Sequence, residues 1–447
     1  MKYKRYSKYK DSGIEWIGEI PEGWEVNRLK FLKKGSLMYG ANEIGELKSS
    51  TNIRYVRITD FDSNGDLRNA NPKFLDYDIA KEFLLEDGDV LLARSGATVG
   101  KSFIYRKKWG KACFAGYLIK FRSNKNIFDH NFFYFYAQSK NYWNYVNSVR
   151  IQATIENVSA DKYSNLPVIV PPIDEQEQIV EFLDKQRKQF NELIAKSKVQ
   201  VTLLEEKKQA TINQVVTKGL DPSVPMKDSG VEWIGEIPKH WEVNRLGYNV
   251  KFMSGFAFDS DKFTDDNNGI NLVRGDNVTE GHIRWGEKTR KWLSMSEDLK
   301  KFVLQENDVL IGMDGSKVGK NFAIVTKTDL PALLVQRVAR LRCLEHLTQK
   351  FVYYLIGNYA FSQYINSVKT NVAIPHMSPL DIKMFPIPVP SSIIEVNQIT
   401  NFLQNKITQF DELIAKSKDQ ITLLEEKKQA LITATVTGKI DVRGTIA

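Results

Sequence analysis

The chain repeats itself almost residue for residue at two places. Residues 11–29 read DSGIEWIGEIPEGWEVNRL and residues 228–246 read DSGVEWIGEIPKHWEVNRL, so that three of nineteen positions differ. Residues 190–210 (FNELIAKSKVQVTLLEEKKQA) and 410–430 (FDELIAKSKDQITLLEEKKQA) differ at three of twenty-one. The offsets are 217 and 220 residues, so one half of the protein is a copy of the other. Such a chain is expected to have two-fold pseudosymmetry.

The segments between the repeated blocks diverge strongly. Two nearly identical frames therefore hold two different inserts, which predicts two related but non-identical binding surfaces. A repeat of this length in a chain of 447 residues fits two large units. We divide the chain into an N-terminal insert region with its frame segment (1–170), a central helix (171–220), a second insert region with its frame segment (221–390) and a C-terminal helix (391–447).

The composition narrows the class of protein. A hydrophobic content of 42% predicts globular domains with real cores, and no apolar run approaches the roughly 18 residues of a membrane helix. The basic N-terminus lacks the apolar segment of a secretory signal. Cys113 and Cys343 occupy non-equivalent repeat positions, which argues against a framework disulfide and suits a reducing cytosol. The few histidines and cysteines form no metal-ligand cluster, and the net charge of +9 suggests an anionic partner.

Each insert region is predicted to be α+β. Short β-type runs are punctuated by Gly, Asn and Asp, as in FDSNGD (61–66) and SDKFTDDNNG (260–269). The predicted strands are Tyr55–Ile58, Val90–Ala93, Ser102–Tyr105, Tyr117–Phe121, Leu272–Arg274, Val309–Gly312, Phe322–Val325 and Val335–Leu341. The aromatic-rich stretches 132–146 and 351–365 fit buried amphipathic helices, because their apolar residues are nearly continuous over more than about ten positions.

A long helix is predicted to follow each insert. The prolines of 165–179 and 384–399 cannot continue a preceding helix, so the long helix begins after them. Ser392 and Glu395 have the spacing of a capping box. About 44 residues at 1.5 Å each would make a rod of roughly 65 Å.

Apolar or small residues recur along both helices at spacings of mostly three and four. They are Phe190, Ile194, Ser197, Val201, Leu204, Ile212 and Val215 in the first helix, and Phe410, Ile414, Ser417, Ile421, Leu424 and Ile432 in the second. A stripe of this length needs a partner, and the equivalent stripe lies in the other copy. We therefore predict that the two helices pair as an antiparallel coiled coil.

Two sets of repeated residues are candidates for docking a partner protein. Trp24 and Trp241 end the IPEGW and IPKHW segments, where a buried packing anchor is the alternative. Glu205, Lys208, Glu425 and Lys428 lie in the repeated LLEEKKQA blocks, where a solvated charged face is the alternative.

Two glycine-rich segments, SGATVGKS (95–102) and DGSKVGKN (314–321), resemble phosphate-binding loops. A nucleotide-binding loop needs G-x-x-x-x-G-K-[ST]. Both segments are one residue short, and β-type sequence follows each of them instead of a helix. We therefore reject ATP binding. Two interpretations stay open: a tight turn between strands, or a turn whose lysine lies close to a DNA phosphate or base edge.

No catalytic constellation recurs in both copies. NPKF (71–74) resembles the NPPF-type motif of amino-methyltransferases, but it lacks the second proline and has no counterpart in copy two. No glycine-rich cofactor segment precedes it, so we interpret it as a turn. Duplication of a catalytic machine would be expected to leave a repeated set of catalytic residues, so its absence from the sequence favours binding over chemistry.

Polar residues do recur at matching places in the two inserts. YVRITDF (55–61) aligns with LVRGDNV (272–278), and the strand ends ARSG (93–96) and MDGS (313–316) also match. Arg, Asn, Asp and Ser are among the side chains that read base edges, and Lys and Arg on loops hold phosphates. The candidate DNA-contacting residues are Arg57, Asp60, Arg94, Ser95, Lys101, Arg274, Asp276, Asn277, Asp314, Ser316, Lys317 and Lys320. For any single one of them, a structural salt bridge is the alternative.

The order of these features resembles the DNA-specificity subunit of type I restriction–modification enzymes. The resemblance rests on the IPxxW segments, the GDVLLARSGATVGK and NDVLIGMDGSKVGK turns, the LPVIVPPIDEQEQI junction and the duplicated ELIAKSK…LLEEKKQA helices. It covers essentially the whole chain. Copy two departs at the junction, where IPVPSSIIEVNQI replaces the usual PP-x-x-EQ-x-I, although Gln398 and Ile399 persist.

The resemblance implies that each insert is a target recognition domain for one half of a bipartite double-stranded DNA site, with the two helices as spacer. It implies two methylation subunits and two motor–nuclease subunits as partners, which would use S-adenosylmethionine, ATP and Mg, in the cytoplasm and away from membranes. The chain itself would bind no cofactor and hold no catalytic site. Two other classes stay open: a coiled-coil scaffold with two ligand-binding domains and no DNA role, and a self-contained DNA methyltransferase.

Overall fold

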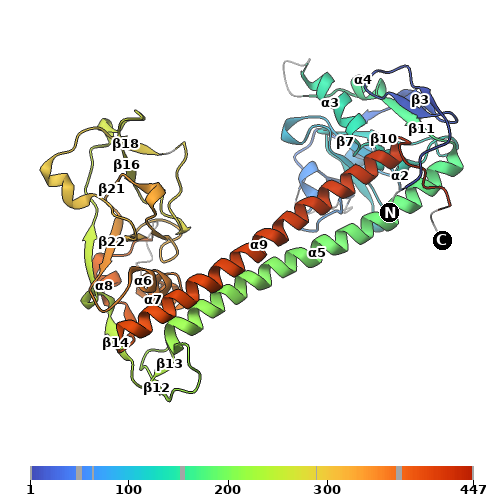
Figure 1. Ribbon diagram of the computed structural model, residues 1–447. Coiled ribbons are helices and arrows are strands. Elements are labelled where there is room, and N and C mark those ends of the chain that lie inside the picture. Colours follow the sequence, from blue (N-terminus) through green and yellow to red (C-terminus); the bar gives the residue numbers. More distant parts are fainter. Residues whose placement is uncertain are drawn as a thin grey trace. The chain divides into compact units, whose positions relative to one another are not determined.

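The computed structural model describes residues 3–46, 53–62, 65–151, 157–287, 289–368 and 375–444. The chain forms two compact units. The first unit comprises Met1–Lys198 and Asp419–Ala447, and the second unit comprises Val199–Lys418. The division runs through the long helices, so each unit contains a frame segment, an insert region and part of each long helix (Figure 1).

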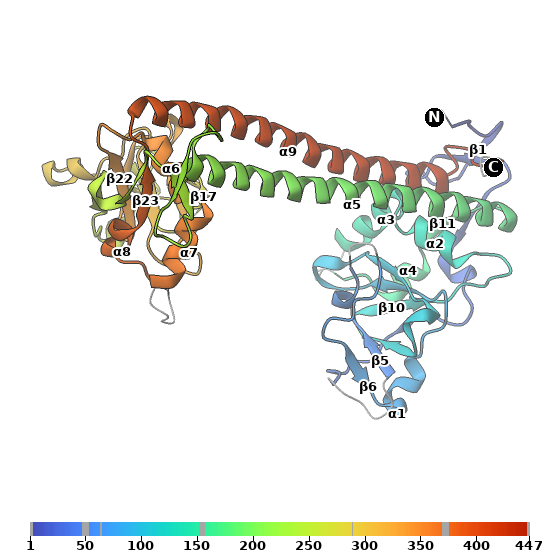
Figure 2. The same ribbon diagram turned by 90° about the horizontal axis from the view of Figure 1, so that it is seen from below.

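The two long helices lie side by side within each unit (Figures 1 and 2). They are α5 (Ile173–Lys218) and α9 (Ile393–Val436). In the first unit Lys428 Nζ donates to Asn191 Oδ1 and Lys198 meets Glu425, so the partner numbers fall along α9 as they rise along α5. This confirms the predicted antiparallel pairing.

The predicted stripe forms the seam between the two helices. Its buried members are Ile194, Ser197, Val201, Ile212, Val215, Ile414, Ser417 and Ile432. Lys208 interrupts the stripe and pairs with Asp411 at 2.6 Å. The matching Lys428 is half-buried, and desolvation lowers the pKa of its amine. The seam is therefore built from apolar and small residues, with one lysine at the same place in each unit.

Two short antiparallel strand pairs build each frame. In the first unit they are β1 (Tyr9–Asp11) with β2 (Glu19–Pro21) and β3 (Glu25–Arg28) with β11 (Pro167–Val170). In the second unit they are β12 (Met226–Asp228) with β13 (Glu236–Pro238) and β14 (Glu242–Arg245) with β23 (Pro386–Val389). The second pair places the frame beside the residues that lead into each long helix.

Trp24 and Trp241 fix each frame to the first turn of a long helix. Trp24 Nε1 donates to Glu175 Oε2 and Trp241 Nε1 donates to Glu395 Oε1, at 3.0 Å in both cases. Both rings are fully buried. The predicted capping box is confirmed for Ser392, which accepts a backbone N–H of the first turn, and wrong for Glu395, because the tryptophan uses its carboxylate.

The insert of the first unit contains two sheets. A four-stranded sheet has the order β4-β10-β7-β8, and a three-stranded sheet has the order β6-β5-β9. The strands are β4 (Met38–Tyr39), β5 (Ile53–Val56), β6 (Lys73–Leu75), β7 (Val90–Ala93), β8 (Ser102–Ile104), β9 (Ala112–Phe114) and β10 (Leu118–Phe121). The small sheet contains the one parallel pair, β5 with β9, among the strands described in this insert.

The insert of the second unit repeats this arrangement with an added strand. Its sheets have the orders β15-β22-β19-β20-β17 and β18-β16-β21. The strands are β15 (Val250–Ser254), β16 (Ile270–Val273), β17 (Glu280–Gly281), β18 (Arg290–Trp292), β19 (Val309–Gly312), β20 (Phe322–Ile324), β21 (Ala332–Leu334) and β22 (Val338–Cys343). Inserts with divergent sequences thus share one topology, which confirms the predicted α+β class.

A buried aspartate ties the larger sheet together in each insert. Arg122 donates to both carboxylate oxygens of Asp89 at 2.7 Å, and Arg342 donates to both oxygens of Asp308 at 2.5 and 2.8 Å. The hydrogen bonds to Asp89 raise the pKa of Arg122. This duplicated ion pair is not among the features predicted from the sequence.

The predicted aromatic-rich helices are each two helices. They are α2 (His130–Tyr136) with α3 (Lys140–Ile151), and α6 (Gln349–Ile356) with α7 (Tyr359–Val368). Each helical stretch is interrupted where Ser139 or Asn358 caps the following helix, because its side chain accepts a backbone N–H of that helix. The polar caps therefore outweigh the continuous apolar pattern. The remaining short helices are α1 (Tyr77–Ala80), α4 (Ala160–Ser164) and α8 (Pro379–Met384).

The part of the chain that the structure describes contains no helix long and apolar enough to cross a membrane. The same residues contain no group of three or more His, Cys, Asp or Glu side chains that could hold a metal ion. Cys113 and Cys343 are both free thiols, and burial raises the pKa of each to about 12. Neither thiol is therefore ionised at neutral pH.

Candidate nucleic-acid interface

Arg57 lies in a tight turn directly after β5. Its backbone N–H donates to Asp60 Oδ2 at 2.9 Å, and its guanidinium contacts both carboxylate oxygens of Asp60 at 2.7 and 3.3 Å. These bonds raise the pKa of Arg57. Asp60 is buried and its oxygens are engaged in the turn, so Asp60 positions Arg57. A base contact by Asp60 stays a prediction.

The turn after β16 has the same construction with a different side chain. The backbone N–H of Arg274 donates to Asn277 Oδ1 at 3.0 Å, and Asn277 is buried. Asn277, and not Asp276, is thus the structural counterpart of Asp60, and it too holds the turn. Asp276 is exposed and lies 3.6 Å from the Arg274 guanidinium.

The glycine-rich segments are tight connections between antiparallel strands, β7 to β8 and β19 to β20. A strand follows each segment, so neither opens a helix as a nucleotide-binding loop does. In the first unit the Arg94 guanidinium stacks over the Tyr39 ring at 4.4 Å, and Arg94 Nε donates weakly to Asn157 Oδ1 at 3.5 Å. Ser95 forms a β-bridge with the same Asn157, and Lys101 is exposed.

The matching segment of the second unit contains an ionic cluster. Asp314 forms a β-bridge with His376, and its carboxylate accepts a hydrogen bond from His376 Nδ1. The same carboxylate forms an ion pair with Arg337 at 2.8 Å. Lys317 pairs with Glu280 at 3.1 Å, and Ser316 is exposed. The backbone is the same as in the first unit, where the bridge joins Ser95 to Asn157, but the chemistry is different.

A hollow of about 630 Å³ in the second unit gathers most of its candidate residues. Its lining includes Arg274, Asp276, Asp314, Ser316 and Lys317, together with Gln336, Arg337 and Arg284, which the sequence analysis missed. Lys320 lies outside it, in a cleft beside α5 and α9. In the first unit Lys101 lines a smaller hollow of about 440 Å³ with Ile58, Arg68 and Gln138.

Arg337 was missed for an identifiable reason. The run Val335–Leu341 has β-type sequence throughout and was predicted as one strand, but β22 begins at Val338. Residues 335–338 form a turn, closed by the Val338 N–H donating to the Val335 oxygen at 3.2 Å. No glycine, proline or asparagine signals that turn in the sequence.

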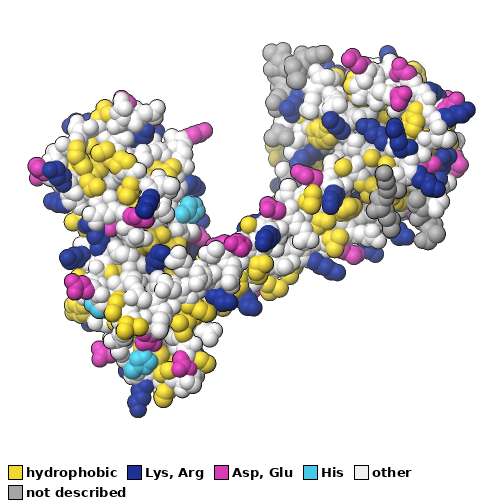
Figure 3. Space-filling model, in the orientation of Figure 1, with side chains coloured by type: hydrophobic (Ala, Val, Ile, Leu, Met, Phe, Trp, Pro, Cys, Tyr) yellow, Lys and Arg dark blue, Asp and Glu magenta, His cyan; other side chains and the backbone are white. Residues whose placement is uncertain are grey.

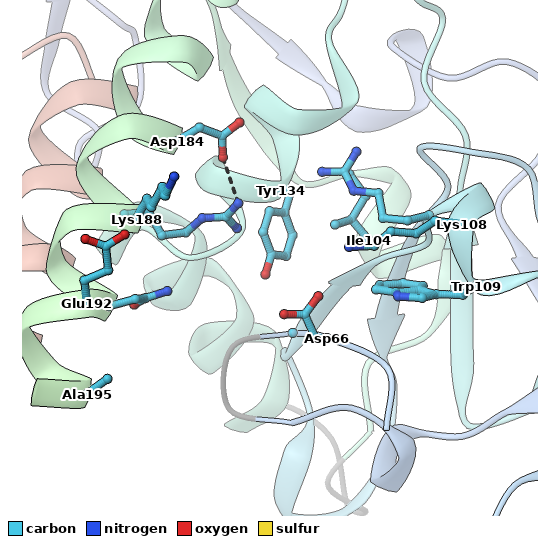
Figure 4. A pocket seen from close by; sticks show the side chains of 13 residues that line it. Asp66, Ile104, Lys108, Trp109, Tyr134, Asp184, Lys188, Glu192 and Ala195 are labelled. Atoms are coloured by element: carbon cyan, nitrogen blue, oxygen red, sulfur yellow. Dashed lines mark hydrogen bonds and ion pairs between the residues drawn. The ribbon is translucent and has the colours of Figure 1, made fainter. Parts of the chain in front are cut away.

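A polar cleft separates α5 from the insert of the first unit (Figure 4). Asp184, Lys188 and Glu192 project from α5 on one side, and Tyr134, Lys108 and Trp109 lie opposite. Asp184 pairs with Arg187 of its own helix at 2.8 Å. Acidic and basic groups are mixed along both walls, so the cleft has no clear preference for an anion.

Figure 3 shows Lys and Arg side chains grouped near the middle of the visible face of the first unit. The visible face of the second unit has basic, acidic and hydrophobic side chains in a mixture. The basic surplus of the chain is therefore not confined to the turns that we selected.

The six candidate docking residues have other roles in the structure. Trp24 and Trp241 are buried within their own units, which agrees with the packing interpretation. Glu205 pairs with Lys418, Glu425 with Lys198, Lys208 with Asp411, and Lys428 with Asn191, all across the helix pair. These charges serve to join the two helices.

The repeated helices also expose leucines at equivalent positions. Leu193 and Leu413 form one repeat pair, Leu203 and Leu423 form the other, and all four are about half exposed. Each of the four comes one residue before a position of the buried stripe, whereas Lys198 and Glu205 come one residue after. Because successive helix residues are about 100° apart, the leucines lie on the opposite side of the helix pair from the ion pairs.

The insert of each unit packs on the ion-pair side. Gln429 donates to the backbone oxygen of Gln138 in the first unit, and Gln209 donates to that of Gly357 at 3.0 Å in the second. Gln138 and Gly357 are the equivalent breaks between paired short helices. The exposed leucines therefore face away from the insert in each unit.

The family model of the type I restriction modification DNA specificity domain matches residues 21–203 and again residues 238–423. The chain is 25% identical over 446 residues to the MjaVIII specificity subunit of Methanocaldococcus jannaschii, which covers 95% of this chain and 94% of that protein. It is 30% identical over 229 residues to the EcoAI specificity subunit of Escherichia coli, covering 50% of this chain and 36% of that protein.

Solved structures share the fold. One, from work on complex assembly and conformational transition of the type I R-M system, has a TM-score of 0.73 at 16% identity and covers 93% of this chain and 98% of that one. The HsdS subunit from Thermoanaerobacter tengcongensis has a TM-score of 0.55 at 18% identity, covering 94% and 98%. The family model matches twice, once in each copy of the repeat, and the chain therefore belongs to the type I restriction–modification DNA specificity family.

Proposed function

We propose that this chain reads a bipartite DNA site, the insert of each unit reading one half. In this proposal the chain directs methylation by two methylation subunits and cleavage by two motor–nuclease subunits. S-adenosylmethionine, ATP and Mg belong to those partners, and the chain itself contributes recognition and no catalytic residue.

One observation carries the proposal: equivalent turns present different side chains on the same backbone. The Ser95–Asn157 bridge of the first unit matches the Asp314–His376 bridge of the second. A duplicated binding protein with two different half-sites needs this combination of a kept scaffold and changed contacts. Membership of the specificity family and the net charge of +9 support DNA as the ligand.

Footprinting and salt titration test the DNA role. The assembled complex should protect two separated half-sites of different sequence, with an unread gap between them. Neutralising about six phosphates would weaken binding on the order of 10³-fold between 50 and 200 mM salt. A continuous or palindromic footprint would contradict the two-module reading. If the complex showed no salt-sensitive DNA binding, the alternative would be favoured, in which the chain is a coiled-coil scaffold with two ligand-binding domains and no DNA role.

We also propose that the exposed leucine face of each unit docks a methylation subunit. The first unit presents Leu193 and Leu423, and the second presents Leu203 and Leu413. The same apolar side chains at the same repeat positions fit one kind of partner bound twice, whereas the inserts differ. Exposed apolar residues on a repeated frame are a typical feature of a protein–protein contact.

Charge substitution in one unit tests this docking. Leu193→Glu with Leu423→Glu should lower the number of bound methylation subunits from two to one, measured by native mass spectrometry. Val199 is a matched control, because it is exposed and its repeat equivalent is already Asp419. Val199→Asp should keep both partners. Two bound subunits in the double variant would contradict the assignment.

The helices are proposed to set the gap between the half-sites. Inserting four residues after Ala195, about one helical turn, lengthens α5 by roughly 6 Å and keeps the stripe nearly in phase. DNA rises about 3.4 Å per base pair, so the gap in the methylation pattern should grow by one or two base pairs with both half-sites unchanged. An unchanged gap would show that the helices only dock partners.

A further inference from the structure

A similar four-residue turn joins the smaller sheet to the larger sheet in each insert, and its third residue is called the tip of the turn. In the first unit it links β9 to β10 through Ala115–Leu118, and in the second it links β21 to β22 through Val335–Val338. The Leu118 N–H donates to Ala115 at 2.9 Å, and the Val338 N–H donates to Val335 at 3.2 Å. These two turns are therefore equivalent by hydrogen bonding as well as by sequence position.

Backbone bonds fix each turn against the neighbouring glycine-rich segment. The Arg94 N–H donates to the oxygen of Tyr117 at 3.0 Å, and the Met313 N–H donates to the oxygen of Arg337 at 2.9 Å. The residue before the tip is also held, because Gly116 N and Gln336 N each donate to a backbone oxygen at 2.7 Å. The same backbone hydrogen bonds therefore hold the tip residue in both units, although φ is positive at Arg337 and not at Tyr117.

The side chain at this position differs completely between the units. Tyr117 is 68% exposed, and the side chain of Arg337 is 67% exposed. Large side chains with such exposure on a well-fixed backbone contribute little to the core. A position with the same backbone hydrogen bonds, strong exposure and changed chemistry is where two related domains would differ in what they read.

Arg337 is held in an unusual conformation. Its φ is +68°, one of three positive values among the non-glycine residues that the structure describes. An arginine in the left-handed region of backbone conformation costs free energy, which the surrounding contacts must offset. Asp314 supplies one such contact, an ion pair of 2.8 Å, and Asp314 is itself held by His376. This arrangement fixes the guanidinium at the rim of the hollow that Arg274 and Lys317 also line.

Tyr117 has different neighbours. Arg94, whose N–H holds the tip, stacks its guanidinium on Tyr39, and the Tyr39 hydroxyl accepts from the Ala160 backbone N–H at 2.9 Å. The guanidinium of Arg94 is therefore engaged with an aromatic ring. The first unit presents at its tip a phenol, with a hydroxyl that can donate or accept one hydrogen bond.

We propose that Tyr117 and Arg337 are equivalent specificity-determining residues, one for each half-site. The proposal rests on the proposed DNA-reading function. Arginine can donate two parallel hydrogen bonds to guanine O6 and N7, the commonest specific contact in the major groove. Arg337 reads a guanine in the half-site of the second unit. Tyr117 cannot form that pair and reads its base through one hydroxyl bond or an apolar ring contact.

The test compares Arg337→Gly with Arg337→Lys in the assembled complex. Glycine tolerates a φ of +68°, so Arg337→Gly removes the guanidinium without straining the turn. Methylation maps and competition between duplexes with single base changes should show discrimination at one guanine of one half-site falling roughly 5- to 150-fold. Arg337→Lys keeps the charge but loses the two-pronged geometry, so it should lose discrimination with a smaller loss of total binding.

Matched variants separate the possible outcomes. Lys327, an exposed cation of the same unit outside the hollow, serves as the charge control, and Lys327→Ala should leave every position of the site as in the wild type. Tyr117→Ala should change only the other half-site. An unchanged site map for Arg337→Gly would overturn the proposal, as would an equal loss at all sequences, which marks a phosphate contact. If the wild-type complex shows no bipartite site, the proposed function fails instead.

Discussion

The two units use one backbone to display two chemistries, and they differ in a graded way. The helix seam, the Trp–Glu anchor and the buried Asp–Arg pair are the same in both. The turns after β5 and β16 keep their geometry but exchange Asp60 for Asn277. At the tip, only the backbone bonds remain the same. The difference between the two units therefore grows from the core toward the exposed turns. This is expected if folding constrains the core residues, whereas the identity of the ligand determines the exposed residues.

The anchors show that even the shared part is not perfectly symmetric. Glu175 accepts from Trp24 and also from the Tyr6 hydroxyl at 2.5 Å, with Arg443 at 3.7 Å. Glu395 accepts from Trp241 and meets the partly exposed His240 at 3.1 Å. The first anchor is thus more buried and better satisfied.

The strongest test of the shared frame is the buried aspartate pair. Asp89→Ala and Asp308→Ala each leave a partly buried arginine and a backbone N–H without their carboxylate. Breaking a buried pair from one side costs about 3–5 kcal/mol, so both variants should lower the free energy of unfolding by similar amounts in denaturant titration. Asp265→Ala removes an exposed pair with Arg290 and should cost less than about 1 kcal/mol. A large difference between the two aspartates would show that the sheets are not equivalent.

Substitutions in the two Trp–Glu anchors should lower the free energy of unfolding by less than the aspartate substitutions do, and by unequal amounts. Glu175→Ala leaves two buried donors unsatisfied and should cost about 2–3 kcal/mol, whereas Glu395→Ala leaves one and should cost about 1–2 kcal/mol. Thermal or denaturant unfolding of both variants measures this. Equal losses would mean that Tyr6 contributes nothing to the first anchor, and Tyr6→Phe checks that point directly.

The turn arginines compare the units at their ligand face. Arg57→Ala and Arg274→Ala should each relax readout at one position of a different half-site, by about 1–3 kcal/mol if the contact is bidentate. Arg57 is held at 2.7 Å by a buried aspartate, and Arg274 lies 3.6 Å from an exposed one. Arg57 should therefore show the sharper preference. Competition binding with single base changes is the measurement, and a uniform loss across sequences would instead mark a phosphate contact.

The sequence predicts the parts of this fold that depend on periodicity and repetition. The stripe of Ile194 and Val201, and the burial of Trp24, follow from local pattern. The partner of Trp24 does not, because Glu175 is 151 residues away in the sequence. The same limit explains Arg337, whose turn has no turn-forming residue and is held by the distant Met313 N–H. Contacts between distant segments decide both. Asn277 is different, because the alignment of 55–61 with 272–278 already places it opposite Asp60 and its contact with Arg274 is local.

The smallest expected effect concerns the ion pairs of the helix seam. Glu205 meets Lys418 at 3.1 Å in the second unit, and the equivalent Glu425 meets Lys198 at 3.9 Å in the first. All four side chains are more than half exposed, so each pair should contribute only about 0.2–1 kcal/mol, and less at high salt. Glu205→Lys should lower the unfolding free energy slightly more than Glu425→Lys, because its pair is closer. Adding Lys418→Glu to Glu205→Lys should recover the loss by restoring opposite charges. If the double variant stays as unstable as the single one, the charge pair does not stabilise the seam, and the buried apolar residues of the seam carry the pairing alone.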